Sequence, residues 1–253
     1  MEWRKSYVDV ILVPLGFLVF SGYHAWLWYK IRTQPLTTII GLNASARRSW
    51  ISTMLKDIDK RNILTVQALR NNIMGSTLMA TTSILLSAGL AAVISSTDSV
   101  KKPLNDIVFG AHGEFMVALK YATLLTTFML SFFCHTLSIL FLNEVSILIG
   151  SSPPAAAMDE LTWHDYLCNL LERGTVLNTV GKRVFYSALP LLYWILGPLL
   201  VFVSWLTMVP VLYSLDIVSS APAQASHINP NKDQGFDAAV EFIYIYRYIC
   251  MKL

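Results

Sequence analysis

The sequence predicts an all-α polytopic membrane protein with four transmembrane helices per subunit. Four long apolar stretches occupy much of the 253-residue chain, roughly Val8–Tyr29, Ile73–Ile94, Tyr121–Leu142 and Val184–Tyr213. Each has about 20 residues or more, enough for a helix to cross a hydrocarbon core of about 30 Å. The composition agrees, with 55% hydrophobic residues, 14% charged residues and a mean hydropathy of +0.53. Helices that are apolar nearly all round belong in a bilayer, because soluble helices keep a polar face.

The first stretch is predicted to be a retained span rather than a cleaved signal. It is too long for a signal peptide, and no small-residue cleavage site follows it. Aromatic residues gather at its far end, as they do where spans meet a membrane surface: Tyr23, Trp26, Trp28 and Tyr29, with His24 among them.

The loop between the first two spans sets the predicted orientation. It carries eight basic residues, Lys30, Arg32, Arg47, Arg48, Lys56, Lys60, Arg61 and Arg70. The next loop has only Lys101 and Lys102 beside acidic residues, and the third adds Arg173, Lys182 and Arg183. The positive-inside rule therefore places the first and third loops in the cytosol. With four spans, both termini and the short acidic loop then face the lumen or the exterior.

Within the first loop, 45–72 carries apolar residues at helical spacing between basic ones. It is predicted to be an amphipathic helix that either continues into the second span or lies on the anionic leaflet. Both alternatives use the same basic face, and anionic lipid is its expected partner.

The third loop opens with a helix stop, Ser151-Ser152-Pro153-Pro154, and 158–173 is predicted to be a short helix. The fourth span contains Pro190, Gly197-Pro198 and Pro210, so we expect a kinked helix. The chain thus divides into a four-helix transmembrane domain with cytosolic helical loops, 1–218, and a variable tail, 219–253.

A stripe of small and weakly polar residues marks the second span. Helical spacing puts its five members on one face: Asn72, Ser76, Ala80, Ser83 and Ser87. Two functions fit this pattern. Small residues let transmembrane helices pack closely, which is the more common use. Their hydroxyls can also solvate an ion at the wall of a pore.

The third span carries a similar stripe, Thr123, Thr127, Ser131, Cys134 and Ser138, with His135 beside it. Ionisable residues inside a membrane usually face a cavity or a partner, so His135 and Glu144 are candidates for either. Glu144 can equally lie at the cytosolic interface as a solvated carboxylate.

Acidic residues flank the short exterior loop. In a ring of subunits, each carboxylate would be repeated around a pore mouth and attract cations. The candidates are Asp98, Asp106, Glu114 and, nearer the cytosolic end, Glu144. In a monomer the same residues form a solvated loop.

No enzyme signature is present in the sequence, so we expect a protein that is not an enzyme and needs no cofactor. Phosphate-binding glycine loops, nucleophile elbows and metal-ligand spacings are missing. The three cysteines, Cys134, Cys168 and Cys250, have no disulfide or ligand spacing. No nucleic-acid-binding pattern occurs.

Several segments together resemble a family of plant membrane proteins named only as a domain of unknown function. They include YVDVILVPLGFLVFSGYHAWLWYKIRTQPLTTIIGL (7–42), RNNIMGSTLMATTSILL within 69–96, KKPLNDIVFGAHGEFMVALK (101–120), and LNTVGKR and ALPLLYWILGP within 177–198. The resemblance covers about 7–218 and implies four spans without assigning a chemistry. Size and layout also resemble small plant immune channels that assemble as pentamers, conduct calcium and lie in the endoplasmic reticulum.

Two functions therefore compete. The first is a homo-oligomeric, pentameric and calcium-permeable cation channel, which needs a ring because one four-helix subunit is too small to enclose a wide path. The second is a membrane adaptor or scaffold that holds lipid or a cytosolic partner without transporting anything. The resemblance favours the channel and the endoplasmic reticulum, with the plasma membrane as the alternative location.

Overall fold

The computed structural model describes residues 2–56, 58–95, 114–151 and 159–218. These residues form six α-helices and one short 3-10 helix. In chain order they are α1 (Glu2–Thr33), η1 (Pro35–Thr37), α2 (Ile39–Lys56), α3 (Ile58–Ser95), α5 (Glu114–Leu148), α6 (Glu160–Tyr193) and α7 (Pro198–Asp216). The prediction of an all-helical fold is confirmed.

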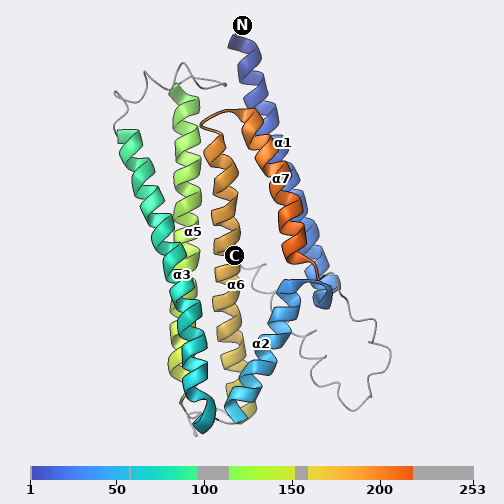
Figure 1. Cartoon of the computed structure of the whole chain (residues 1–253), viewed down its shortest axis with the longest axis vertical. Coiled ribbons are helices and arrows are strands. Elements are labelled where there is room, and N and C mark those ends of the chain that lie inside the picture. Colours follow the sequence, from blue (N-terminus) through green and yellow to red (C-terminus); the bar gives the residue numbers. More distant parts are fainter. Residues whose placement is uncertain (1, 57, 96–113, 152–158, 219–253) are drawn as a thin grey trace.

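The long helices form two groups (Figure 1). In one group, α3, α5 and α6 run side by side along the long axis of the molecule, and α5 lies between the other two and packs on both. In the other group, α1 pairs with α7. The turn Trp194–Gly197 joins α6 to α7, while α2 leads from the end of α1 toward the lower end of the first group.

Four helices are long and apolar enough to cross a membrane, at Ile11–Thr33, Ile63–Ser95, Met116–Leu148 and Pro198–Asp216. The first three contain most or all of the predicted spans, and the prediction of four long apolar helices that could cross a membrane is confirmed. The helix α6 also runs beside α5, in the direction opposite to α7, so it makes a further passage along the molecule. However, α3 and α5 are longer than a bilayer requires. At about 1.5 Å per residue the 38 residues of α3 extend about 57 Å, against about 30 Å of hydrocarbon.

The prediction of a single kinked fourth span over Val184–Tyr213 is wrong. The helix α6 ends at Tyr193, four residues form a turn, and α7 starts at Pro198 and runs back (Figure 1). Pro198 begins a helix because its missing N–H costs nothing in the first turn. The apolar stretch therefore forms a hairpin of two helices, and the predicted short helix at 158–173 continues as α6 through Gly174 and Gly181 to Tyr193.

This hairpin changes the predicted orientation of the chain end. Because α7 runs parallel to α1, its last residues reach the C-terminal end of α1. There Thr38 and Ile217 form an antiparallel bridge, and the N–H of Val218 donates to the carbonyl of Thr37 at 3.1 Å. At Val218 the chain thus lies on the side of the basic first loop. The prediction that the chain is back on the side of the N-terminus after its last span is therefore wrong. The tail itself lies outside the described residues.

The single amphipathic helix predicted over 45–72 is also replaced by two helices. The helix α2 runs away from the end of α1, and α3 begins at Ile58 and returns (Figure 1). Together with the adjoining ends of α3, α5 and α6, α2 forms what we call the basal bundle. Its buried core includes residues of all four helices: Ile51, Leu69, Leu142, Val145, Leu167 and Leu171. Because α1 and α7 end above it, the basal bundle extends past the ends of these two helices (Figure 1).

Candidate functional site

The predicted stripe of α3 lies largely inside the subunit. Ser76, Ser83 and Ser87 are buried, and so is Ala80; Asn72, at the lower end of the stripe, is exposed. This face of α3 packs on α5. Such burial is what helix packing produces. The pore role of these residues belongs to an assembly and stays a prediction.

Hydroxyl groups connect α3, α5 and α6 at the centre of the first helix group. Ser83 Oγ lies 3.2 Å from Ser131 Oγ on α5, and Ser131 Oγ donates to the carbonyl of Gly181 on α6 at 3.1 Å. Two helical turns nearer the basal bundle, Ser138 Oγ donates to the carbonyl of Gly174 at 2.7 Å. We call this set the polar seam: Ser83, Ser131, His135, Ser138, Gly174 and Gly181.

His135 is completely buried in the polar seam, packed against Gly181. A Cβ added to Gly181 would lie 2.6 Å from the imidazole ring, so only glycine leaves room for it. The ring atom Nδ1 lies 2.8 Å from the carbonyl oxygen of Ser131. Because a carbonyl only accepts, this contact assigns the proton to Nδ1 and the lone pair to Nε2. Within the described part of the chain, Nε2 has no hydrogen-bond partner.

An ion pair joins the basal bundle across α2 and α6. The guanidinium of Arg47 donates from Nη2 to both carboxylate oxygens of Glu172 at 3.0 Å, and from Nε at 3.3 Å. The side chain of Glu172 is almost fully buried. Burial raises the pKa of Glu172 above its ordinary value, and the neighbouring Arg47 opposes that rise.

A second ionic cluster joins the two helix groups, and it was not among the predicted site residues. Asp216, the last residue of α7, accepts from Arg183 on α6 and, at 2.6 Å, from the hydroxyl of Tyr23 on α1. Asp216 is buried. The only signal in the sequence is one carboxylate at the end of an apolar stretch, and such residues usually find a charged partner.

The acidic candidates do not gather at one place in the described part of the chain. Asp98 and Asp106 lie outside the described residues. Glu114 is the first residue of α5, and its side chain is not described, whereas Glu144 is exposed near the other end of the same helix. The separation of these two positions is about 45 Å along the helix, so Glu114 and Glu144 mark opposite ends of α5.

Metal ligands do not cluster either: among the described residues, no group of three His, Cys, Asp or Glu side chains is placed to hold an ion. The imidazole of His164 lies 3.4 Å from a carboxylate oxygen of Asp165 and 3.7 Å from the sulfur of Cys168, both on its own helix.

The fold defines a polytopic helical membrane protein. The chain belongs to the family described as "Protein of unknown function, DUF599", whose model matches residues 11–221. The resemblance to a membrane protein family of unknown function is thereby confirmed at the level of the family. No curated protein and no solved structure matches the chain.

Proposed function

We propose that the chain is the subunit of a homo-oligomeric cation channel, pentameric and permeable to calcium. The observation that supports assembly is a face of small residues on α3, on which Gly75 and Gly89 are exposed and Thr82 is half-buried. Gly75, Thr82 and Gly89 recur every seven residues, which is two helical turns, so they share one face. A Cβ added at Gly75 or Gly89 would meet no atom within 4 Å. Faces of this kind let a second transmembrane helix approach closely.

The peripheral position of α3 fits this role. It packs mainly on α5, so one side of the helix is open (Figure 1). The open side also carries the exposed hydroxyl residues Thr77 and Thr81. In a ring, these residues are better placed to line a path than Ser76, Ser83 or Ser87, which are covered by α5. Asp98, Asp106, Glu114 and Glu144 remain the proposed cation-attracting residues.

Size and layout also support the channel, since the chain resembles WeiTsing, a pentameric calcium-permeable channel of the endoplasmic reticulum that acts in plant immunity. By this resemblance we propose the endoplasmic reticulum as its membrane, calcium and other cations as permeant ions, and a role in plant defence. A fluorescent fusion imaged beside organelle markers tests the location.

The experiment that tests the channel combines mass and current. Purified full-length protein is weighed by native mass spectrometry and then reconstituted into planar bilayers with a calcium gradient. We expect a closed ring and calcium-carrying currents. Gly75→Leu and Gly89→Leu should reduce both, because the bulky side chains hold neighbouring helices apart. Gly22→Leu is the matched control, since Gly22 of α1 also has open space around it. A monomer that carries no current would contradict the proposal.

A second candidate function, a membrane adaptor, is supported by the basal bundle. This bundle extends past the ends of α1 and α7 and has a core of its own. It also exposes large apolar side chains near its end, including Ile63 at 81% and Leu161 at 71%. Leu161 lies outside the candidate membrane spans, and exposed apolar residues at such positions are typical of contact surfaces. The adaptor would be favoured if the protein is monomeric and carries no current in bilayers. A partner should then cross-link to the native chain but not to Ile63→Asp or Leu161→Asp.

A further inference from the structure

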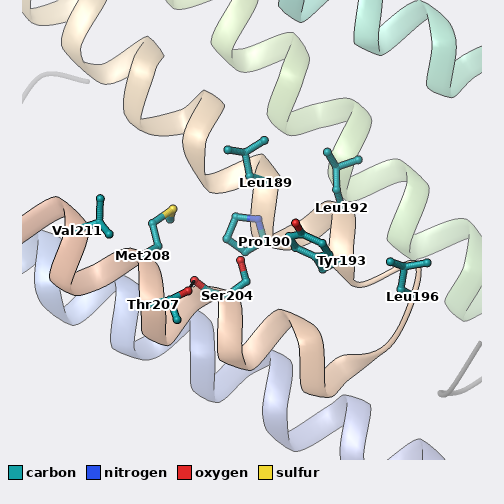
Figure 2. Close-up of a pocket in the computed structure, with 9 residues that line it drawn as sticks. All are labelled: Leu189, Pro190, Leu192, Tyr193, Leu196, Ser204, Thr207, Met208 and Val211. Atoms are coloured by element: carbon teal, nitrogen blue, oxygen red, sulfur yellow. Dashed lines mark hydrogen bonds between the residues drawn. The ribbon is translucent and has the colours of Figure 1, made fainter.

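A groove lies between the C-terminal end of α6 and the neighbouring face of α7 (Figure 2). Its volume is about 550 Å³, within the range of about 300–1,000 Å³ typical of small-molecule sites. Its walls include Leu189, Pro190 and Tyr193 on α6 and Ser204, Thr207 and Met208 on α7. Because the α7 residues lie inside the membrane-length helix Pro198–Asp216, the groove is at the depth of the lipid chains.

The walls of the groove are apolar in character. The hydroxyl of Thr207 donates to the carbonyl of Ser204 at 3.0 Å, so its hydrogen-bonding capacity is used within its own helix. Ser204 and Thr207 are also small, which leaves space between the helices that larger side chains would fill. Leu189, Tyr193 and Leu196 remain exposed at the edge. The groove therefore opens sideways, toward the surrounding bilayer.

The exposed face of α6 continues from the groove toward the basal bundle. Lys182, Tyr186, Leu189 and Tyr193 follow one another at spacings of four, three and four residues, which places them on one helical face. All four are exposed. Lys182 lies about 10 Å below Leu189 along the helix. Lys182 therefore lies at the end of this exposed face that is nearer the basic first loop.

We propose that this groove binds one acyl chain of an anionic phospholipid, whose head-group phosphate pairs with Lys182. At this depth the apolar walls face hydrocarbon, and lysine side chains near a membrane surface extend their ammonium groups to the head groups. The side of the basic loop is also the side where the positive-inside rule places the anionic leaflet. Apolar walls at chain depth and a cation at head-group depth are complementary to the two parts of such a lipid. This site is separate from the channel and does not depend on it.

The test reconstitutes the full-length protein in nanodiscs with equal amounts of phosphatidylglycerol and phosphatidylcholine. Native mass spectrometry then counts the lipids that each chain retains. We expect one retained phosphatidylglycerol per chain. Lys182→Gln should lower the preference for phosphatidylglycerol about five-fold, which is the usual effect of one basic residue near an anionic surface. Arg70→Gln is the charge control, because Arg70 is exposed on α3 away from the groove.

Filling the groove tests the chain-binding half of the proposal. Leu189→Trp should abolish retention of the lipid, whereas Leu199→Trp, at a residue 64% exposed on α7 outside the groove, should leave it unchanged. If Leu189→Trp does not fold, Ser204→Phe fills the groove from the α7 side. Equal retention in the Leu189 and Leu199 variants would overturn the proposal, as would equal retention of both lipids by the native chain. Efficient cross-linking of Leu189→Cys to a second copy would show that the groove is a subunit interface, and would also overturn it.

Discussion

Arg183 and Asp216 form an ion pair between α6 and α7 at the level where α1 reaches them, and Tyr23 of α1 donates to the second oxygen of the same carboxylate. One buried carboxylate thus joins three helices from both groups. No other described ionic contact joins the α1–α7 pair to α6.

We predict that Asp216→Ala destabilises the protein by about 3 kcal/mol, because it removes the buried carboxylate that pairs with the half-buried Arg183. Tyr23→Phe should cost less, about 1–3 kcal/mol, since it removes one hydrogen bond to a charged group. Thermal unfolding in detergent, followed by size-exclusion chromatography, measures both. Equal stability of Asp216→Ala and the native chain would contradict the importance of the cluster.

The pH dependence of the unfolding temperature should show the effect of protonating Glu172. Its pKa is raised above the ordinary value of 4.5 in the folded state by burial, so the folded state holds this proton more tightly than the unfolded state. The stability linked to it is fully present below pH 4.5 and is lost as the pH rises through the folded pKa. The unfolding temperature of the native chain should therefore fall relative to Glu172→Gln over that range.

Gly181→Ala should destabilise the polar seam by about 1–3 kcal/mol, because the new methyl group would overlap the buried ring of His135. The matched control is Gly75→Ala, where open space surrounds the glycine. There the better helix propensity of alanine should leave stability unchanged or raise it. Combining Gly181→Ala with His135→Ala should recover part of the loss. A harmless Gly181→Ala would mean that the ring can move aside.

Ser83→Leu separates helix packing from pore lining. Because Ser83 is buried within 3.2 Å of Ser131, a leucine should overpack the polar seam and cost about 1–3 kcal/mol, with loss of folded protein. Ser83→Ala should cost about 1 kcal/mol. For both variants, thermal unfolding and bilayer currents are measured on the same preparation. If Ser83→Leu instead stays folded and reduces only the current, the side chain faces the conducting path in the assembly.

The orientation of the chain can be tested with impermeant reagents. Ser49→Cys on α2 should be labelled from the cytosolic side, and a reporter inserted after Val218 should report that same side, because α7 ends beside the start of α2. The N-terminus should report the opposite side. Asn43 should remain without glycan. A reporter after Val218 that faces the lumen would contradict the parallel arrangement of α1 and α7.

Hydrophobicity alone predicted the number of membrane-length helices, because about 20 apolar residues are a strong signal whatever surrounds them. It did not predict the turn at Trp194–Gly197, since tryptophan, isoleucine and leucine keep the stretch apolar while only Gly197 and Pro198 mark the reversal. The prolines were interpreted as a kink, and the position of Arg183 opposite Asp216 becomes visible only when the helices are paired in space. Helical spacing predicts that the stripe residues of α3 share one face, but hydropathy carries no information on whether that face meets α5 or another subunit.

The continuous length of α6 has a mechanical consequence. Its 34 residues, about 51 Å, run from Glu160 in the basal bundle through Glu172 to Tyr193 at the opposite end of the molecule. Because α6 is continuous, it connects the Arg47–Glu172 pair on α2 directly with the Arg183–Asp216 pair on α7. The two ion pairs thus share one rigid element, and a change in the position of α2 can reach α7 without passing through α3 or α5.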